Sequence, residues 1–505
     1  MGPARRAVLA VALLGATLVV APPASARDAV VTSFDGTRIT THFFPAEGVA
    51  PGQRVPTVLQ GPGWSSPGST AQDAPTSTGG GTVGIGPLRR AGYNVVTWDP
   101  RGFGTSTGVV QIDSPRFEGR DVSALLDFVA RQPEALVDRG RDPRVGMTGG
   151  SYGGGIQLVA AAIDRRIDAI VPDIAWNSLR TSLYLNATAK TGWSSLLYAA
   201  AGLNGGRLDP RIDEANEEAS TTGVISPAGV RFFASRGPGS LVSDIRAPTL
   251  IIQGTVDTLF PLREAVANYR LLRAAGTPVK MLWFCGGHGI CLTPQGDTSR
   301  IERASLDWLA RHLKRDRSVS TGARFEYLDQ TGASLTARDY PLPASRPLVA
   351  TGTGTLRLVP EGGSGPAPLT GAAVALAPVV GTRATNAVDV AIRGRLGGRV
   401  VGAPRLSLTY SGSAPRPRAR IVAQLVDEAT DTVLSNIVTP VPLRLDGRRR
   451  TVDLPLEVVT AAAPSTARFT LQLTAQSSQY DVRPRGGSVT FSRIRIALPT
   501  VRRAS

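Results

Sequence analysis

The chain has 505 residues, of which 42% are hydrophobic and 19% are charged, and this composition excludes a mainly disordered or fibrous protein. Its length exceeds that of a usual single hydrophobic core, so we expect two domains. The formal net charge of +17 comes mostly from scattered arginines, with clusters at residues 448–450 and 502–503. Such charge can attract an anionic cell-envelope surface, although a solvated surface is the simpler explanation and no nucleic-acid-binding motif accompanies it.

The first 26 residues have the pattern of a secretory signal peptide. Arg5 and Arg6 precede an apolar run over residues 7–21, and residues 24–26 read Ala-Ser-Ala, a small-residue cleavage site. The alternative is a retained membrane anchor, but the run is shorter than the ~20 apolar residues that a membrane span needs. We therefore expect cleavage after Ala26 and a secreted or extracytoplasmic protein without a membrane span.

From residue 29 onward, β-prone and helical patterns alternate along the chain. Two β-rich runs flank a turn at Asp35-Gly36, and a short apolar run then leads into the glycine-rich loop Gly61-Pro62-Gly63. The following pattern predicts a helix ending near Arg90, strands over 94–98, 145–148 and 169–174, and helices over 121–131 and 156–163. This order favours a parallel sheet covered by helices on both faces.

Residues from about 177 to 243 interrupt this alternation with aromatic side chains set among glycines and charges. We interpret them as an inserted cap; the alternative is an irregular segment that only packs on the sheet. The alternation then resumes with strands over 249–253 and 279–284 and helices over 262–275 and 301–313. The first domain is therefore expected over residues 27–320.

A second domain is predicted over residues 323–505. Short β-prone runs, such as 405–410, 469–474 and 488–496, are separated there by glycine and proline, and no long helical pattern occurs. Short strands at this spacing are typical of a β-sandwich or jelly roll.

The motif Gly-x-Ser-x-Gly occurs twice, around Ser151 and around Ser106. A serine hydroxyl becomes a useful nucleophile when it lies on a tight strand-to-helix turn beside a base. Ser151 has this setting, because a β-prone run precedes it and residues 153–155, all glycine, lead into an apolar helix. No helix begins directly after Ser106, so we interpret Ser106 as part of a structural loop near the site.

The base should be one of three histidines, His42, His288 and His312. His288 lies in a glycine loop after the last predicted strand of the first domain, where the chain order nucleophile, acid, base places the histidine. His42 precedes the nucleophile, and His312 lies in a helix among arginines and a lysine. The acid should follow the preceding strand, and Asp257 is the one acid in that loop; a carboxylate there orients the imidazole.

An oxyanion needs two hydrogen-bond donors, usually the backbone N–H after the nucleophile and one from the loop after an early strand. Tyr152 supplies the first. Pro62 has no N–H, so Gly63 or Trp64 is expected to supply the second, the alternative being an ordinary glycine turn.

The two cysteines of the chain, Cys285 and Cys291, lie on either side of His288. In an exported protein a disulfide between them is permitted and would close a small ring around the histidine. Whether it forms depends on the spacing of the two Cα atoms.

The run from Trp98 to Gly108, the turn at Ser151, and the loops of Asp257 and His288 together resemble the Xaa-Pro dipeptidyl-peptidase and cocaine-esterase-like family of α/β-hydrolases. The β-rich residues from about 323 are similar to the C-terminal jelly-roll domain of that family. The resemblance implies an α/β-hydrolase fold with an inserted cap. Members often take one oxyanion donor from a tyrosine side chain, whereas the corresponding stretch here ends in Trp64, so the resemblance does not transfer substrate specificity.

These observations favour an exported serine hydrolase that cleaves a small peptide or ester through an acyl-enzyme. The alternatives are an acyl esterase of the same family and a catalytically inert cell-envelope binding protein. Glu214, Glu217 or Glu218 of the cap could bind the free amine of a dipeptide, but the solvated face of a helix explains them better. The sequence contains no metal cluster, phosphate loop or dinucleotide motif, so we expect no metal and no cofactor.

Overall fold

The computed structural model describes residues 25–76, 82–365, 380–394, 398–484 and 486–502. The predicted signal peptide, apart from Ser25 and Ala26, lies outside the described residues. Among the helices that the structure describes, none is long and apolar enough to cross a membrane.

The first domain is built on a large twisted sheet whose central strands run parallel, as the alternation of strands and helices predicts. Within the described residues the strand order is β1-β2-β4-β3-β7-β8-β9-β10-β11-β12, with β1, β2 and β12 antiparallel at the edges. The strands are β1 (Arg27–Thr32), β2 (Arg38–Phe44), β3 (Thr57–Gln60), β4 (Asn94–Trp98), β7 (Val145–Gly150), β8 (Ile167–Asp173), β9 (Thr249–Gly254), β10 (Val279–Phe284), β11 (Phe325–Leu328) and β12 (Ser334–Ala337).

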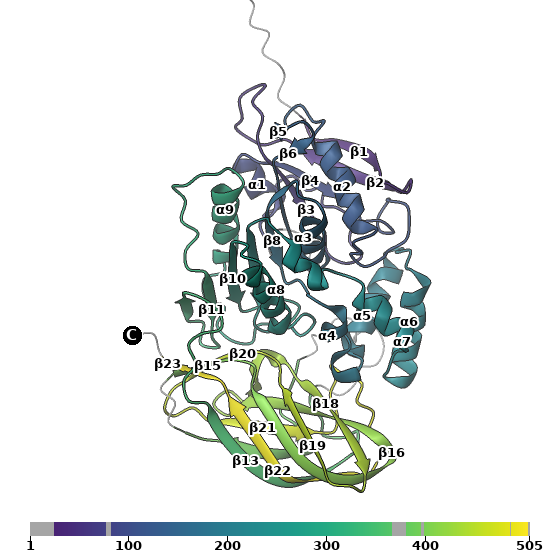
Figure 1. Ribbon diagram of the computed structural model, residues 1–505, viewed down its shortest axis with the longest axis vertical. Helices are drawn as coiled ribbons and strands as arrows, with labels where there is room; N and C mark the ends of the chain where they lie inside the picture. Colours follow the sequence, from purple (N-terminus) through teal and green to yellow (C-terminus); the bar gives the residue numbers. More distant parts are fainter. Residues whose placement is uncertain (1–24, 77–81, 366–379, 395–397, 485, 503–505) are drawn as a thin grey trace, which may run out of the picture.

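Helices cover both faces of this sheet, which explains why its central strands are apolar at nearly every position (Figure 1). Side chains of β3 alternate between the two layers: Leu59 packs with the cluster under α2, α3 and α8, and Val58 packs with the cluster under α1 and α9. The helices are α1 (Ile85–Arg90), α2 (Glu118–Val129), α3 (Tyr152–Ile163), α8 (Leu262–Ala274) and α9 (Arg300–His312). A two-stranded ribbon of β5 (Val137–Arg139) and β6 (Asp142–Pro143) precedes β7.

The first sheet continues past residue 320, where the sequence predicted the domain to end. β11 pairs in parallel with β10, and β12 pairs with β11, so residues 325–337 belong to the first sheet and not to the second domain. The prediction was wrong here because a short β-prone run looks the same in sequence whichever sheet it joins.

The predicted cap lies between β8 and β9 and is helical, which excludes an irregular segment. Two of its helices begin at a proline that follows a capping side chain: Asp209 accepts the N–H of Arg211, and Ser226 accepts the N–H of Gly229. The cap consists of α4 (Leu179–Ser182), η1 (Leu185–Ala187), α5 (Thr191–Leu203), α6 (Pro210–Thr222), α7 (Pro227–Ala234) and η2 (Gly239–Asp244).

The C-terminal domain is an antiparallel β structure with its own apolar core, as predicted. Its long strand β16 pairs with β19 and β22 along its first half and with β18 and β21 along its second half. The strands at the two ends of the main sheet, β13 and β14, approach each other, because Gly352 and Gly354 of β13 leave room for Val390 and Val388 of β14. The sheet therefore closes almost into a barrel.

The strands of the main C-terminal sheet in the described residues are β13 (Leu348–Arg357), β14 (Ala387–Ile392), β16 (Arg405–Asp427), β17 (Thr432–Val433), β18 (Thr439–Asp446), β19 (Arg450–Pro455), β21 (Phe469–Thr474) and β22 (Ser488–Leu498). A smaller sheet contains β15 (Gly398–Gly402), β20 (Val459–Ala463) and β23 (Thr500–Arg502), and η4 (Leu434–Asn436) connects β17 to β18. Figure 1 shows this domain directly below the first domain and the lower end of the cap. The ion pair between Arg263 and Glu457, 2.9 Å long, joins the two domains.

Candidate active site

Ser151 lies on the sharp turn between β7 and α3, with a backbone φ of 57° and ψ of −118°. This is a strained conformation for a residue with a side chain, and it holds the hydroxyl at the carboxyl end of the sheet. The turn packs closely against the loop after β3, because a Cβ on Gly153 would collide with the carbonyl of Gly61. The glycines around Ser151 are therefore needed for the approach of two backbones.

The structure brings Ser151, His288 and Asp257 into one hydrogen-bonded series. His288 Nε2 lies 2.8 Å from Ser151 Oγ, and His288 Nδ1 lies 2.8 Å from Asp257 Oδ2. The other oxygen of Asp257 accepts the N–H groups of Leu259 and Phe260 at 3.0 and 2.8 Å. With the Nδ1 proton donated to Asp257, Nε2 can accept the proton of the serine hydroxyl.

The loops that carry Asp257 and His288 touch each other at glycine. Gly287 has a φ of 102°, and a Cβ there would lie 2.7 Å from the Cβ of Asp257. A Cβ on Gly289 would collide with the carbonyl of Val256, next to Asp257. Any larger residue at either position would separate the two loops, so the glycines permit the close approach of His288 to Asp257.

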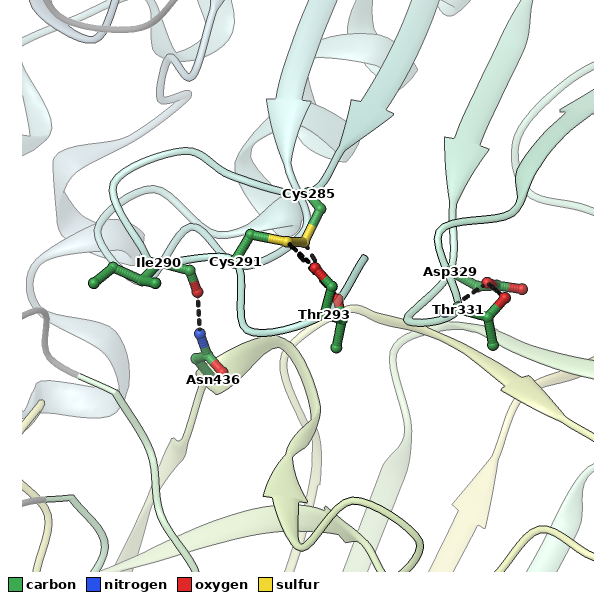
Figure 2. The surroundings of a disulfide bond; sticks show 7 residues. All are labelled: Cys285, Ile290, Cys291, Thr293, Asp329, Thr331 and Asn436. Carbon is green, nitrogen blue, oxygen red and sulfur yellow. Dashed lines mark hydrogen bonds between the residues drawn. A yellow bond between two sulfur atoms is a disulfide. The ribbon is translucent and has the colours of Figure 1, made fainter. Parts of the chain in front are cut away.

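A disulfide joins Cys285 to Cys291, with the two Cα atoms 5.5 Å apart. It closes the loop that contains His288, as the sequence permitted (Figure 2). The C-terminal domain also holds this loop, because the side-chain amide of Asn436 donates to the carbonyl of Ile290 at 2.8 Å. The loop of His288 is thus held by a covalent ring and by a contact from the second domain.

The residues predicted to stabilise an oxyanion lie beside Ser151. Tyr152 begins α3, so its N–H is one of those that have no acceptor within the helix. The ring of Trp64 packs edge-on against that of Tyr152, with centroids 5.3 Å apart, and both residues line the same cavity as Ser151. The indole N–H of Trp64 donates to the carbonyl of Leu197, so a donor from this loop must be a backbone N–H of Gly63 or Trp64. The assignment of the oxyanion site remains a prediction.

The other candidate residues lie apart from this site. Ser106 is fully buried, and its hydroxyl donates to the carbonyl of Asp99 at 2.7 Å and accepts the N–H of Thr40. His42 contacts Asp28, and His312 packs against the ring of Trp308. Burial lowers the pKa of His312 to about 4. These contacts give Ser106 and the two histidines structural roles.

Arg101, in the run from Trp98 to Gly108, also has a structural role. Its buried guanidinium pairs with Asp121 of α2 and with Asp35. A neighbouring carboxylate, Glu118, lies 3.4 Å from the hydroxyl of Tyr152, and burial raises the pKa of Glu118 to about 7. The residue after the nucleophile is therefore anchored at its far end by a buried polar group.

A cavity of about 120 Å³ opens beside Ser151 and beneath the cap. Its walls are mainly apolar, with contributions from α4, α5, α6 and α7 and from Trp176 and Phe260. The glutamates considered for amine binding do not line it: Glu214 and Glu217 are exposed, and Glu218 accepts the N–H of Ser226 at 2.7 Å. The cap therefore presents apolar side chains to the candidate nucleophile.

The sequence pattern of the X-Pro dipeptidyl-peptidase (S15) family matches residues 35–289, which are half of the chain and include Ser151, Asp257 and His288. The chain belongs to the X-Pro dipeptidyl-peptidase (S15) family.

Solved structures with a similar fold cover both domains of this S15 family member. A CocE/NonD family hydrolase from Staphylococcus aureus is 13% identical with a TM-score of 0.70, over 94% of this chain and 93% of that chain. An aminopeptidase from a marine sediment Thaumarchaeota archaeon is 15% identical with a TM-score of 0.71, over 94% and 96%. An alpha-amino acid ester hydrolase is 13% identical with a TM-score of 0.70, over 97% and 100%. At these identities the likeness shows the fold alone.

The curated proteins add a short local match. A protein described as an uncharacterized 31.7 kDa protein in the traX-finO intergenic region of Escherichia coli is 34% identical over 86 residues. The match covers 17% of this S15 family member and 28% of the length of that relative.

Sequence reasoning missed Lys190, a fully buried residue just before α5. Its ammonium donates to the carbonyls of Thr258 and Leu259 at 2.9 and 3.0 Å, directly after Asp257. Burial lowers the pKa of Lys190 to about 8. The available signal was that Lys190 is one of only three lysines in a chain whose other cationic residues are arginines.

Proposed function

We propose that this protein is an exported serine hydrolase that cleaves a peptide or ester bond through an acyl-enzyme. The observation that carries the proposal is the hydrogen-bonded series from Ser151 through His288 to Asp257, with both distances at 2.8 Å, beside a cavity. A binding protein without catalytic activity does not require a serine, a histidine and an aspartate at these hydrogen-bonding distances.

The geometry supports a two-step acyl transfer. His288 Nε2 takes the proton of Ser151 while the serine oxygen attacks the carbonyl carbon of the substrate, and Asp257 stabilises the resulting imidazolium. Backbone N–H groups of Tyr152 and of Gly63 or Trp64 would bind the oxyanion. His288 then gives the proton to the leaving group, and a water molecule releases the acyl group by the reverse steps.

Two observations support export. The first 26 residues have the pattern of a signal peptide, and the disulfide in the His288 loop suits an oxidising compartment. N-terminal sequencing of protein secreted by an expressing cell tests this part of the proposal. A first residue at position 27 would support it, whereas an intact leader on protein retained in the cell would contradict it.

The decisive experiment measures hydrolysis of a chromogenic ester and of an Xaa-Pro anilide by the mature protein. Ser151→Ala should abolish both activities without changing the melting temperature by more than a few degrees. Ser106→Ala is a matched control, since Ser106 occupies the second Gly-x-Ser-x-Gly motif, and it should keep its activity once folding has been verified. Full activity in Ser151→Ala would overturn the proposal.

A further inference from the structure

The cavity beside Ser151 has a marked charge asymmetry. Among the described residues that line it there is no carboxylate, and the charged group in the lining is the guanidinium of Arg180 from α4. Arg180 is exposed, and no carboxylate of the described residues forms an ion pair with it. A positively charged substrate group buried in this cavity would therefore find no carboxylate among the described lining residues to pair with; Asp213, outside the lining, bonds to the hydroxyl of Tyr198.

The face of α6 that lines this cavity carries no acidic side chain. Ile212, Ala215 and Ala219 lie at positions i, i+3 and i+7 and line the cavity together with Asn216. The glutamates Glu214 and Glu217 occupy the opposite, exposed side. The polar group that α6 presents to the cavity is thus the uncharged amide of Asn216.

We infer that this site takes an uncharged, apolar acyl group and rejects substrates with a free ammonium group next to the scissile carbonyl. This inference rests on the proposed serine-hydrolase function. An ammonium group loses its hydration when buried, and without a partner the loss outweighs the contacts that the rest of the acyl group makes. The cavity volume of about 120 Å³ is of the order of the ~150 Å³ of a dry, apolar cavity that binds benzene, so the acyl group should be about the size of one ring.

Three methyl esters of matched shape test the inference, with acid release followed in a pH-stat at pH 5.5, about two units below the usual pKa of an α-amino group, so that less than about 1% of the amine is neutral. They are methyl 3-phenylpropanoate, methyl phenylalaninate and methyl N-acetylphenylalaninate. We expect kcat/KM to be at least about 100-fold higher for 3-phenylpropanoate than for phenylalaninate, because the ammonium is left unpaired. Acetylation should restore much of the activity, since it removes the charge and keeps the ring.

Each outcome separates this inference from the proposed function. Hydrolysis that depends on Ser151 but is as fast with the free amine as without it would overturn the inference and leave the serine mechanism standing. Rejection of the N-acetyl ester together with the free amine would also overturn it, because bulk and not charge would then decide. Hydrolysis that persists in Ser151→Ala would instead defeat the proposed function.

A gain-of-function variant tests the role of α6 independently. Asn216→Asp places a carboxylate on the cavity face and should reduce the preference for the amine-free ester by at least about tenfold, because it supplies the missing anion. Ser220→Asp is the matched control, since it adds the same charge at an exposed position of α6 and should leave the preference unchanged. If the ratio of kcat/KM for the amine-free ester to that for the free-amine ester were the same in the two variants, the placement of the acyl group beneath α6 would be wrong.

Discussion

The candidate active site has two halves that are built in different ways. Backbone contacts and hydrogen bonds with short distances hold the loops of Ser151, Asp257 and His288. The cavity beneath the cap is instead lined by side chains, many of them from the cap helices α4 to α7 and others such as Trp176 and Phe260 from outside them, and most of these side chains are apolar. Under the proposed function, the first half would fix the reacting atoms and the second half would determine which acyl group fits.

This difference predicts how each half responds to substitution. In the loops a single added methyl group can displace a reacting atom, because backbones meet at Gly287 and Gly289. In the cavity a change of volume should alter the choice of substrate and leave the chemistry intact. The two halves can therefore be separated experimentally by comparing effects on kcat with effects on acyl preference.

The largest effect is expected from Asp257→Asn. An asparagine can still accept the N–H groups of Leu259 and Phe260, but its amide cannot accept the Nδ1 proton of His288. By analogy with the corresponding change in other serine hydrolases, kcat should fall by about 10⁴-fold, with an unchanged melting temperature. Steady-state kinetics and thermal unfolding measure both quantities, and a loss of less than tenfold would mean that Asp257 does not orient the base.

Gly287→Ala should have the next largest effect. The added Cβ would lie 2.7 Å from the Cβ of Asp257, so the loops must move apart and the hydrogen bond between His288 and Asp257 must lengthen. A displacement of about 1 Å can cost about 100-fold in rate, and kcat should fall by an amount of this order.

The control for this substitution is Gly276→Ala. Gly276 also has a positive φ, 73°, but no heavy atom lies within 4 Å of the added Cβ. Both variants should lose at least about 1 kcal/mol of stability from backbone strain, Gly287→Ala the more because of its contact with Asp257, and only Gly287→Ala should lose activity. Equal losses of activity would show that strain alone, and not the contact with Asp257, matters.

The sequence allowed prediction of the residues that the loops bring together. A nucleophile after a strand, an acid after a later strand and a histidine after the last must meet, because parallel strands place their carboxyl ends at one edge of the sheet. The strands that carry Ser151, Asp257 and His288 were predicted at nearly their observed positions. Each of these strands is a short β-prone run that ends in glycine or is followed by glycine within two residues, so both the strand and the turn after it can be predicted from the local sequence.

The residues that support these loops could not be predicted in the same way. Asn436 meets Ile290 across 146 residues of chain, and no local pattern connects the two positions. For α6 the sequence favoured a solvated face for the glutamates, and Glu214 and Glu217 are exposed, but it did not indicate that Asn216 faces the cavity. The orientation of a cap helix depends on the packing of the whole cap, which a single sequence does not reveal.

Removal of the disulfide should have a moderate effect on both stability and activity. Closing a loop with a sequence separation of six contributes about 2 kcal/mol in the chain-entropy model, so reduction or Cys285→Ser with Cys291→Ser should lower the unfolding free energy by up to this amount. Activity should fall only several-fold, because the hydrogen bond from Asn436 to Ile290 still holds the loop after the disulfide is removed. Denaturant titration and kinetics on verified reduced protein measure both effects, and unchanged kinetics would show that the ring does not position His288.

The smallest effect on turnover is expected from Phe233→Ala, which enlarges the cavity from the side of α7. Phe233 is half-buried, so the loss of stability should be below the ~3–5 kcal/mol of a fully buried phenylalanine. The preferred acyl group should become larger. The kcat/KM for a bulky apolar ester should rise by at least about tenfold relative to that for a butyrate ester, since even one methylene in a hydrophobic pocket is worth about 1–3 kcal/mol. Competition between the two esters measures this ratio directly. If kcat fell equally for both esters while their ratio stayed constant, the cap would act on the reacting groups themselves, and the division between loops that perform the chemistry and a cap that selects the substrate would be wrong.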